Sequence, residues 1–476
     1  MKGRLFIFCL VIFFTTCISK SNKSQQVTIA AGTLQKDLAI LKKTLEEAHP
    51  GLYWYSTQAA IDSLFDNAKG SIRGDMTPLD FFKILLPMIA GINCSHTNIR
   101  LPRSENDSVA LPFTNLLPVE LYVVNGKGYI RRQFSGDGFG GAEVLSINGV
   151  SLPDILSKLM SGIPSDGYNQ AYKYQALNRG VMVEAYALHF GDTAVYTMEI
   201  KDSSGNLQTI RLDAASPQQV RASIQPSLPV FSVRYKDSVA VLSIHSFQLN
   251  TAAFEDSVSN IFQALQTKKI RKLIIDLRQN GGGNNENVST LFSFMAHTSF
   301  RHLRQAEMLG KTLTYSSSVS NATGIDRYPR THPNGDRYLV NDSYSGTRLS
   351  NPRDSFHFAG EVVLLTSGAT VSAASEFVAV FHHQQRGKIV GEETGGCYYG
   401  STGGNYLQLR LPGSGLEIRI PTIRIFTAVE EDYVKQPKGR GTFPDYIITP
   451  TVEDIMVGKD VQLEKAMEVL REYNYK

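Results

Sequence analysis

The chain has 476 residues, of which 42% are hydrophobic and 19% are charged, and its formal net charge is +4. This composition is ordinary for a globular protein and excludes the disordered and fibrous classes. The length exceeds the size at which a single core stops growing, so we expect two or three domains. The net charge is small and no basic block is present, which argues against nucleic acid as a partner.

The N-terminus has the layout of a secretory signal. Two basic residues, Lys2 and Arg4, precede an apolar run at 5–14, and small residues follow up to Cys17. The apolar run is too short for a permanent membrane span. We therefore expect a leader at 1–17 and a tether at 18–32, in a protein exported to a bacterial periplasm or cell envelope.

Cys17 leaves a second interpretation of the leader open. A cysteine directly after such an apolar core resembles a bacterial lipoprotein acceptor, although the preceding Phe-Thr-Thr departs from the usual acceptor sequence. The alternatives are simple removal of the leader and attachment to the outer membrane through a lipid on Cys17.

Residues 33–102 carry a helical pattern, which predicts an N-terminal helical domain. Leucines recur at three- and four-residue spacing between 34 and 45. Further helices are expected at 57–69 and 78–90, the second with Thr77 as its cap and a first-turn proline.

Residues 103–225 change to a β pattern, which predicts a mainly-β domain. Two strands at 119–124 and 129–132 flank an Asn-Gly pair, a hairpin signal. A helix is expected after them, at 152–159.

Residues 226–476 alternate apolar strands with helices, which predicts βαβ units and a largely parallel sheet. A long polar segment near 299–358 interrupts this pattern as an insertion. The expected strands are 238–244, 272–277 and 361–365, and the expected helices are 252–266, 288–297 and 373–382.

Ser372 lies where the chain turns from a strand into a helix beginning near Ala373. A serine at such a turn points its hydroxyl outward, at the helix end where developing negative charge is stabilised. From this segment alone, a plain helix N-cap is the commoner role. Ser372 is nevertheless our candidate nucleophile.

Two other segments supply candidate partners. The glycines at 281–283 end a buried strand, where a backbone N–H can approach an oxyanion, although a tight turn is the simpler alternative. The run lacks the ending of a phosphate loop. His96, beside Ser95, is a candidate base, since histidine is the commonest base near neutral pH. The pair His382-His383 lacks helical ligand spacing, so we expect no metal and no other cofactor.

Three motifs occur in a characteristic order. They are Asp276-Leu-Arg-x-Asn-Gly-Gly-Gly283, Leu364-Leu-Thr-Ser followed by Ser372-Ala-Ala, and Val390-Gly-Glu-Glu-Thr-Gly-Gly396. Together they resemble the tail-specific, or C-terminal processing, serine peptidases. The resemblance is closer to the branch with the tricorn protease core and the interphotoreceptor retinoid-binding modules.

The resemblance extends over essentially the whole mature chain. Residues 45–53 are similar to the helical opening of bacterial members, and residues 141–149 weakly resemble the carboxylate loop of a PDZ domain. The resemblance implies an α/β multidomain fold. Its parts are an N-terminal helical arm, a PDZ-like mainly-β domain and a ClpP/crotonase-like βαβ catalytic domain.

The identity of the base differs between the two branches. Tail-specific enzymes pair the serine with a lysine, and Cys397 stands at that position here. The tricorn branch uses a histidine preceded by a serine, which Ser95-His96 matches. The resemblance therefore implies that His96 is the base and Ser95 its hydrogen-bonded supporter.

The resemblance also implies the remaining parts of the site. It assigns oxyanion donors to the N–H groups of Ala373 and Gly283, with Gly282 as the neighbouring alternative. A late glutamate corresponds to Glu430 or Glu431, and the sequence does not choose between them.

The mature chain has two cysteines, Cys94 and Cys397. A disulfide between them would tie the helical arm to the catalytic domain. Two unpaired buried thiols are the favoured interpretation.

These observations predict an exported serine-type endopeptidase that acts on proteins or peptides through an acyl-enzyme on Ser372, without a cofactor. The main alternative is a non-catalytic ligand- or peptide-binding protein on the same fold, because fold alone does not define function. A PDZ-type scaffold that binds C-termini without cutting them is a weaker alternative.

Overall fold

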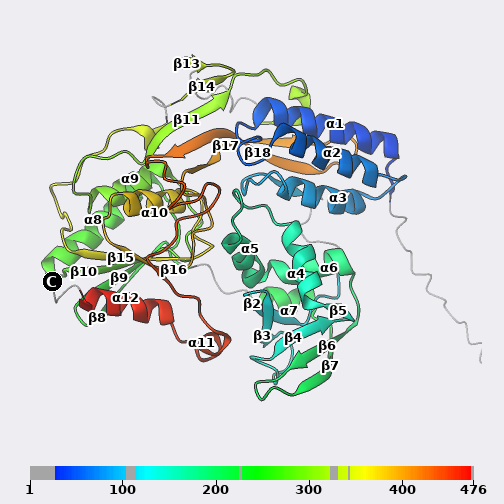
Figure 1. The fold of residues 1–476 in the computed structure, drawn as a ribbon, viewed down its shortest axis with the longest axis horizontal. Helices are drawn as coiled ribbons and strands as arrows, with labels where there is room; N and C mark the ends of the chain where they lie inside the picture. The colour runs from blue at the N-terminus through cyan, green and yellow to red at the C-terminus, as the bar shows by residue number, and fades with distance from the viewer. Residues whose placement is uncertain (1–26, 103–112, 224–227, 322–330, 341–343, 473–476) are drawn as a thin grey trace, which may run out of the picture.

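The structure is a computed structural model that describes residues 27–102, 113–223, 228–321, 331–340 and 344–472. The expected leader, with Cys17 and most of the tether, lies outside the described residues. In the described part of the chain, no helix has the length and apolarity needed to cross a membrane. The described residues form three β-sheets with their helices, a mixed α/β architecture of several units as expected (Figure 1).

Three helices open the described chain, at the positions expected for the helical arm. They are α1 (Ala31–Ala48), α2 (Gln58–Ser71) and α3 (Pro78–Ala90). The regularly spaced leucines of α1 are buried, because this spacing places them on one face of the helix. The Thr77 side chain accepts a hydrogen bond from the Asp80 N–H, which confirms the predicted cap of α3.

The helical arm packs on a seven-stranded sheet with which it shares one hydrophobic core (Figure 1). The sheet has the order β12-β17-β18-β11-β14-β13, with β1 pairing to β18. Its strands are β1 (Asn98–Arg100), β11 (Leu303–Leu309), β12 (Val319–Ser320), β13 (Thr331–Asn334), β14 (Arg337–Leu339), β17 (Gly400–Arg410) and β18 (Glu417–Thr427).

The polar segment 299–358 contains four of these strands, β11 to β14, which the sequence did not reveal. One reason is that buried charges interrupt the apolar pattern. Glu307 on β11 is 1% exposed, and its carboxylate pairs with Arg337 at 3.1 Å and with Arg424 at 2.6 Å. Burial of such a charge requires partners, which here come from two neighbouring strands.

The middle of the chain forms a second unit around an antiparallel sheet with the order β2-β3-β4-β6-β7 and with β5 beside β4. The predicted hairpin is present, and its turn is Asn125-Gly126, with positive φ at both residues. Helices at 171–190, which the β pattern did not suggest, cover the sheet together with α4. The PDZ-like identity of this domain remains a prediction. Its elements are β2 (Val119–Val124), β3 (Lys127–Gln133), β4 (Glu143–Ile147), β5 (Val150–Ser151), α4 (Leu152–Ser161), α5 (Ala171–Ala176), η1 (Leu177–Val181), α6 (Met182–Phe190), β6 (Val195–Lys201), β7 (Leu207–Asp213) and α7 (Pro217–Ala222).

The third sheet has the order β19-β16-β15-β10-β9-β8 and is parallel except for the pairing of β8 with β9, which confirms the predicted topology. Alternate residues of its strands face α8, α9 and α10 on one side and α12 on the other, which explains the continuous apolar runs. The elements are β8 (Phe231–Lys236), β9 (Val239–Ile244), α8 (Thr251–Thr267), β10 (Lys272–Asp276), α9 (Asn285–Ser293), β15 (Glu361–Thr366), α10 (Ala373–His383), β16 (Lys388–Gly391), β19 (Tyr446–Ile447), α11 (Val452–Val457) and α12 (Val461–Glu472).

Arg278 joins the carboxyl end of β10 to the start of α12, and its guanidinium donates to Asp276 and Asp460, both at 2.7 Å. Arg278→Ala leaves the largely buried Asp276 carboxylate and the partly exposed Asp460 carboxylate without this partner. We expect it to lower the free energy of unfolding by about 3 kcal/mol, as measured by urea denaturation. The control Arg131→Ala removes a half-exposed arginine from Glu120, which keeps its second partner Arg132, and should cost less than about 1 kcal/mol. Equal effects of the two changes would contradict this role of Arg278.

Candidate active site

Ser372 occupies a strained turn between β15 and α10. Its backbone has φ 55° and ψ −134°, a conformation that a residue with a side chain rarely adopts. Ser372 stands at the N-cap position, but its side chain makes no capping hydrogen bond. The interpretation as a plain helix cap is therefore wrong. A serine on a strained strand-to-helix turn presents its hydroxyl at the end of the sheet.

Loops at the carboxyl ends of two neighbouring strands hold this turn. The Val371 N–H donates to the Asn280 carbonyl at 3.2 Å, and the Thr370 hydroxyl donates to the Leu277 carbonyl at 2.8 Å. From the other side, the Gly395 N–H donates to the Thr370 carbonyl at 2.9 Å. The loops after β10 and β16, which carry two of the sequence motifs, thus serve to fix the Ser372 turn.

His96 approaches Ser372 from the loop between α3 and β1. The His96 Nε2 lies 3.2 Å from the Ser372 Oγ, and the His96 Nδ1 lies 3.2 Å from the Ser95 Oγ. The structure therefore brings together the three side chains that the sequence singled out. The distance from Nε2 to the hydroxyl is suitable for proton transfer.

The loop carrying His96 is fixed by the residues that follow α1 and by β17. The His49 Nε2 lies 2.9 Å from the Thr97 Oγ1, and the Cys94 Sγ lies 2.8 Å from the Thr402 Oγ1. Burial lowers the pKa of His49 to about 3, so this side chain is neutral. At Gly51 an added Cβ would come within 2.4 Å of the Thr402 side chain, so only glycine allows this close approach. The 45–53 segment therefore helps to hold the His96 loop in place.

Two backbone N–H groups beside Ser372 are without a hydrogen-bond partner among the described residues, those of Ala373 and Gly283. The N–H of Gly282 is occupied, because it donates to the Asn280 Oδ1 at 2.8 Å. A Cβ on Gly282 would lie 2.7 Å from the Ser372 Cβ, so this glycine packs directly against the serine. Of the two glycines named from the sequence, Gly283 is thus the one with a free donor.

Burial is the largest influence on His96 and lowers the pKa of its imidazole. The Asp166 carboxylate opposes this shift and raises the pKa, and Glu376 acts in the same direction. Arg419 acts against them and lowers it. His96 also stacks on Tyr406, with ring centroids 6.1 Å apart. The imidazole therefore favours its neutral form, as a base requires.

The structure does not bring Glu430 or Glu431 to this group. Glu431 pairs with Arg304 at 3.1 Å on an exposed surface, and both glutamates line a depression of about 730 Å³ elsewhere on the molecule. The acids that act on His96 are Asp166 and Glu376, which the sequence analysis did not identify.

Neither of these two acids carries a signal of its own in the sequence. Asp166 is one polar residue in a polar loop. Glu376 has the spacing of any residue one helical turn after Ser372. It is buried, and its carboxylate lies 3.2 Å from both the His302 Nε2 and the Ser401 Oγ.

Cys94 and Cys397 are free and buried, so the disulfide alternative is wrong and the favoured interpretation is confirmed. Burial raises the pKa of the Cys397 thiol well above its ordinary value. A protonated thiol does not accept the proton of a serine hydroxyl. Cys397, at the position of the tail-specific lysine, thus offers no substitute base.

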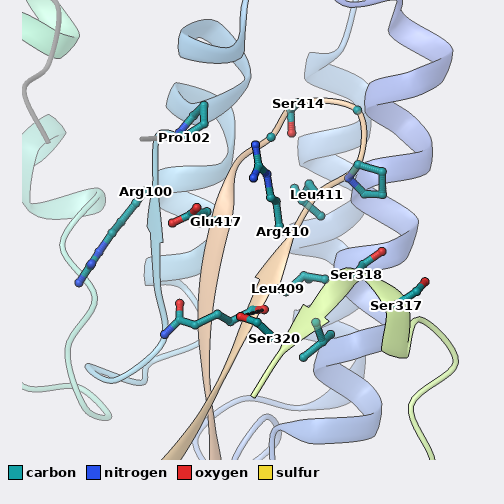
Figure 2. Close-up of a pocket in the computed structure, with 15 residues that line it drawn as sticks. Arg100, Pro102, Ser317, Ser318, Ser320, Leu409, Arg410, Leu411, Ser414 and Glu417 are labelled. Carbon is teal, nitrogen blue, oxygen red and sulfur yellow. Dashed lines mark hydrogen bonds between the residues drawn. The ribbon is translucent and has the colours of Figure 1, made fainter. Parts of the chain in front are cut away.

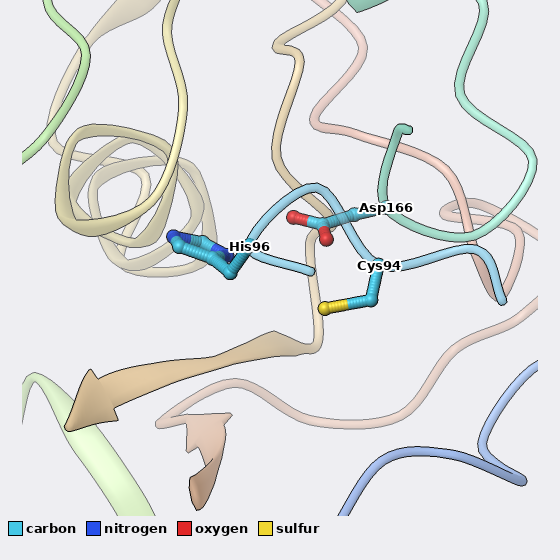
Figure 3. A group of neighbouring side chains, drawn as sticks. All are labelled: Cys94, His96 and Asp166. Carbon is cyan, nitrogen blue, oxygen red and sulfur yellow. The ribbon is translucent and has the colours of Figure 1, made fainter. Parts of the chain in front are cut away.

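Cys94, His96 and Asp166 form a compact group whose sulfur, nitrogen and oxygen atoms lie within 4.8 Å of one another (Figure 3). Such atoms can hold a metal ion, but most of them are already hydrogen-bonded. The Cys94 Sγ contacts Thr402, the His96 Nδ1 contacts Ser95, and the Asp166 Oδ1 accepts from the Ser95 N–H. Burial also raises the pKa of Cys94 to about 11, which keeps the thiol protonated. The group is best described as a hydrogen-bonded network around the histidine.

A wide depression of about 1010 Å³ lies at the tip of the β17–β18 hairpin (Figure 2). Arg100, Arg410 and Glu417 line it together with several serines. None of the residues near Ser372 or His96 contributes to its lining. The depression is therefore separate from the candidate active site.

Comparisons with known proteins identify a family match and solved structures of similar fold. Residues 238–448 match peptidase family S41, which confirms the family resemblance. Mature CPAF has the same fold, with a TM-score of 0.64 and 15% identity over 92% of this chain and 96% of that chain. Mature CPAF complexed with lactacystin has a TM-score of 0.65 and 15% identity, over 93% of this chain and 98% of that chain. The tricorn protease has a TM-score of 0.40 and 13% identity, over 93% of this chain and 37% of that chain. A sequence search of the curated proteins found no match.

Gly282→Ala tests the packing of the glycine loop against Ser372. The new Cβ would meet Ser372 and the Val371 carbonyl, at a residue whose φ is +93°. We expect the rate of Ser372 labelling by a fluorophosphonate to fall at least about 100-fold, the loss typical of a damaged oxyanion site.

Gly281→Ala is the matched control, since nothing lies within 4 Å of its Cβ position. The control should label within about threefold of the unmodified chain, as expected for a tolerated substitution. Equal labelling of the two variants would show that the close approach of Gly282 is unimportant.

Proposed function

We propose that this chain, which is a peptidase by its peptidase family S41 domain at 238–448, cleaves peptide bonds through an acyl-enzyme on Ser372 with His96 as the base. The observation that carries the proposal is the 3.2 Å contact between the Ser372 Oγ and the His96 Nε2. It joins residues from two separate units, and it coincides with the strained backbone of Ser372.

In the first step His96 Nε2 accepts the hydroxyl proton while the Ser372 Oγ attacks the scissile carbonyl. The imidazole must carry its other proton on Nδ1 for this role. Ser95 supports that tautomer, because its Oγ lies within hydrogen-bond distance of Nδ1 and can accept the proton. The protonated His96 then donates to the leaving amine, and water releases the acyl group by the reverse sequence.

The tetrahedral oxyanion is held by the N–H groups of Ala373 and Gly283, which are free of other partners in the described structure. The N-terminus of α10 contributes its positive dipole end at the same point. Such donors, fixed before the reaction, stabilise charge that appears only in the transition state.

The competing hypothesis, a non-catalytic binding protein on the same fold, accounts for less of this geometry. A binding protein has no need of a strained serine with a histidine in contact and two unpaired N–H groups beside it. Strained backbone of this kind persists where function requires it.

The substrates are proteins or peptides, in keeping with the family. We propose further that the enzyme acts after export to the cell envelope. This part rests on the leader-like sequence at 1–17, and both interpretations of Cys17 remain open.

Ser372→Ala and His96→Gln should each lower kcat for a peptide substrate by about 10⁴-fold or more, because each removes one member of a unit that acts together. Cys397→Ala should retain kcat within about tenfold, because the thiol takes no part in proton transfer. Hydrolysis of a fluorogenic peptide library measures all three. Full activity in His96→Gln together with loss of activity in Cys397→Ala would transfer the role of base to the cysteine.

The pH dependence of kcat/KM reports the pKa of His96 in the free enzyme. Burial lowers that pKa, so the neutral base persists to lower pH than an ordinary histidine allows. We expect activity to fall on the acid side with a midpoint below about 6.5, the ordinary value for histidine. A midpoint above about 7 would contradict the assignment of the base.

A further inference from the structure

The loop between α4 and α5 crosses from the middle domain to the candidate active site. It is fixed there by backbone and side-chain contacts on two sides. The Gly167 N–H donates to the Asn93 carbonyl at 3.0 Å, beside the His96 loop. The Tyr168 N–H donates to the Gly439 carbonyl at 2.8 Å, and the Asn169 side chain donates to the Thr394 carbonyl at 2.7 Å. This loop thus touches both the histidine loop and the loops beneath Ser372.

Asp166 lies at the centre of this loop and points toward the His96 loop (Figure 3). Its Oδ1 accepts the Ser95 N–H at 2.8 Å. Burial raises the pKa of Asp166, whereas the charge of His96 and the hydrogen bonds from Ser95 oppose this shift and favour the anion. The Ser95 Oγ lies 3.2 Å from the His96 Nδ1. Asp166, Ser95 and His96 therefore form a continuous chain that ends at the Ser372 Oγ.

We propose that Asp166 is a positioning residue for His96, acting through Ser95, so that the middle domain supplies an essential part of the catalytic site. The inference rests on the proposed function. Asp166 takes no proton in the reaction. Its carboxylate orients Ser95 by accepting the N–H, and its charge stabilises the imidazolium that forms when His96 accepts the serine proton.

The burial of Asp166 makes this influence strong. The side chain is 2% exposed, and its Oδ2 has no hydrogen-bond partner among the described residues. A buried carboxylate with an unsatisfied oxygen is unfavourable on its own. A positive charge on the neighbouring imidazole relieves that cost, and at such short range an opposite charge stabilises the protonated form of a histidine.

Other ionisable groups also act on His96. Those on the elements packed around it are Asp166, Glu376 on α10, Arg419 on β18 and His49 after α1, with Cys94 and Tyr406 beside the ring. Among the groups that raise the pKa of His96, Asp166 has the larger effect and Glu376 the smaller. Glu376 is also engaged with His302 and Ser401, whereas Asp166 is directed at the base.

Asp166→Asn keeps the shape of the side chain and removes its charge. We expect kcat to fall about 10- to 100-fold with little change in KM, and the acid limb of kcat/KM to move about one pH unit lower. The limb moves lower because loss of the anion further depresses the pKa of His96. The matched control is Asp192→Asn, an exposed aspartate of the middle domain that accepts from the Thr114 N–H at 3.2 Å. The control should leave both kcat and the limb unchanged.

Nuclear magnetic resonance of the histidine Cε1–H groups supplies a readout that needs no turnover. The His96 signal, assigned with His96→Gln, should titrate about one unit lower in Asp166→Asn than in the unmodified chain. If the unmodified chain hydrolyses no peptide but this shift is present, the proposed function fails and the coupling of Asp166 to His96 stands. If the unmodified chain is active and Asp166→Asn changes neither the titration nor kcat, the inference is overturned and the proposed function stands.

A double-mutant cycle separates positioning from general damage to the fold. Asp166 and Ser95 belong to one hydrogen-bonded chain, so the effects of Asp166→Asn and Ser95→Ala on kcat should be non-additive. The shift of the acid limb comes from the charge of Asp166 and should appear whether or not residue 95 carries a hydroxyl. Additive losses, or a fall in kcat without movement of the acid limb, would mean that Asp166 serves only the structure. If Asp166→Asn folds poorly, Asp166→Glu, which keeps the charge, takes its place. The His96 signal should then titrate close to its position in the unmodified chain, and a titration about one unit lower would contradict the charge effect.

Discussion

The contact between the Ser372 Oγ and the His96 Nε2, at 3.2 Å, is the interaction on which the rest of this structure depends. The two residues lie in different units, so neither unit contains a complete site. Ser372 stands at the carboxyl end of the parallel sheet, the edge where such sheets place their functional residues. His96 belongs to the helical arm, which reaches that edge because the arm shares a core with the seven-stranded sheet. The helices of the arm pack beside the long strands β17 and β18 (Figure 1).

The cost of the strained turn at Ser372 is about 1–3 kcal/mol, and the surrounding loops offset it. Asn280 holds the turn from the loop after β10, and Gly395 holds it from the loop after β16. Both loops can approach only because glycines leave room, as at Gly282 against Ser372. The glycines of these motifs are therefore needed for close packing of the loops as well as for the chemistry of the site. Within the part of the chain that the structure describes, the same packing leaves the N–H groups of Ala373 and Gly283 unpaired beside the serine, where an oxyanion would use them.

The order of motifs in the sequence predicted the family resemblance, whereas the spacing of apolar residues predicted the helical arm and the parallel sheet. Ser372 was named from one of these motifs, and Ser95 and His96 were named because they match the serine–histidine pair of the tricorn branch. Asp166 was not found, because its loop has no local sequence pattern. Asp166 comes close to His96 only because the middle domain packs against the His96 loop. Glu430 and Glu431 were expected from their place in the sequence, but the chain after β18 turns away from the site toward Arg304. The strands within 299–358 were missed because buried charged residues such as Glu307 interrupt the apolar alternation that identifies a strand.

Identification of the residue that reacts with a peptidyl fluorophosphonate tests the central claim most directly. Proteolytic digestion and mass spectrometry of the treated protein should locate a single adduct on the Ser372 Oγ, and the His96→Gln variant should form that adduct far more slowly. An adduct on another residue, or a rate that is the same with and without His96, would contradict the pairing of this serine with this histidine.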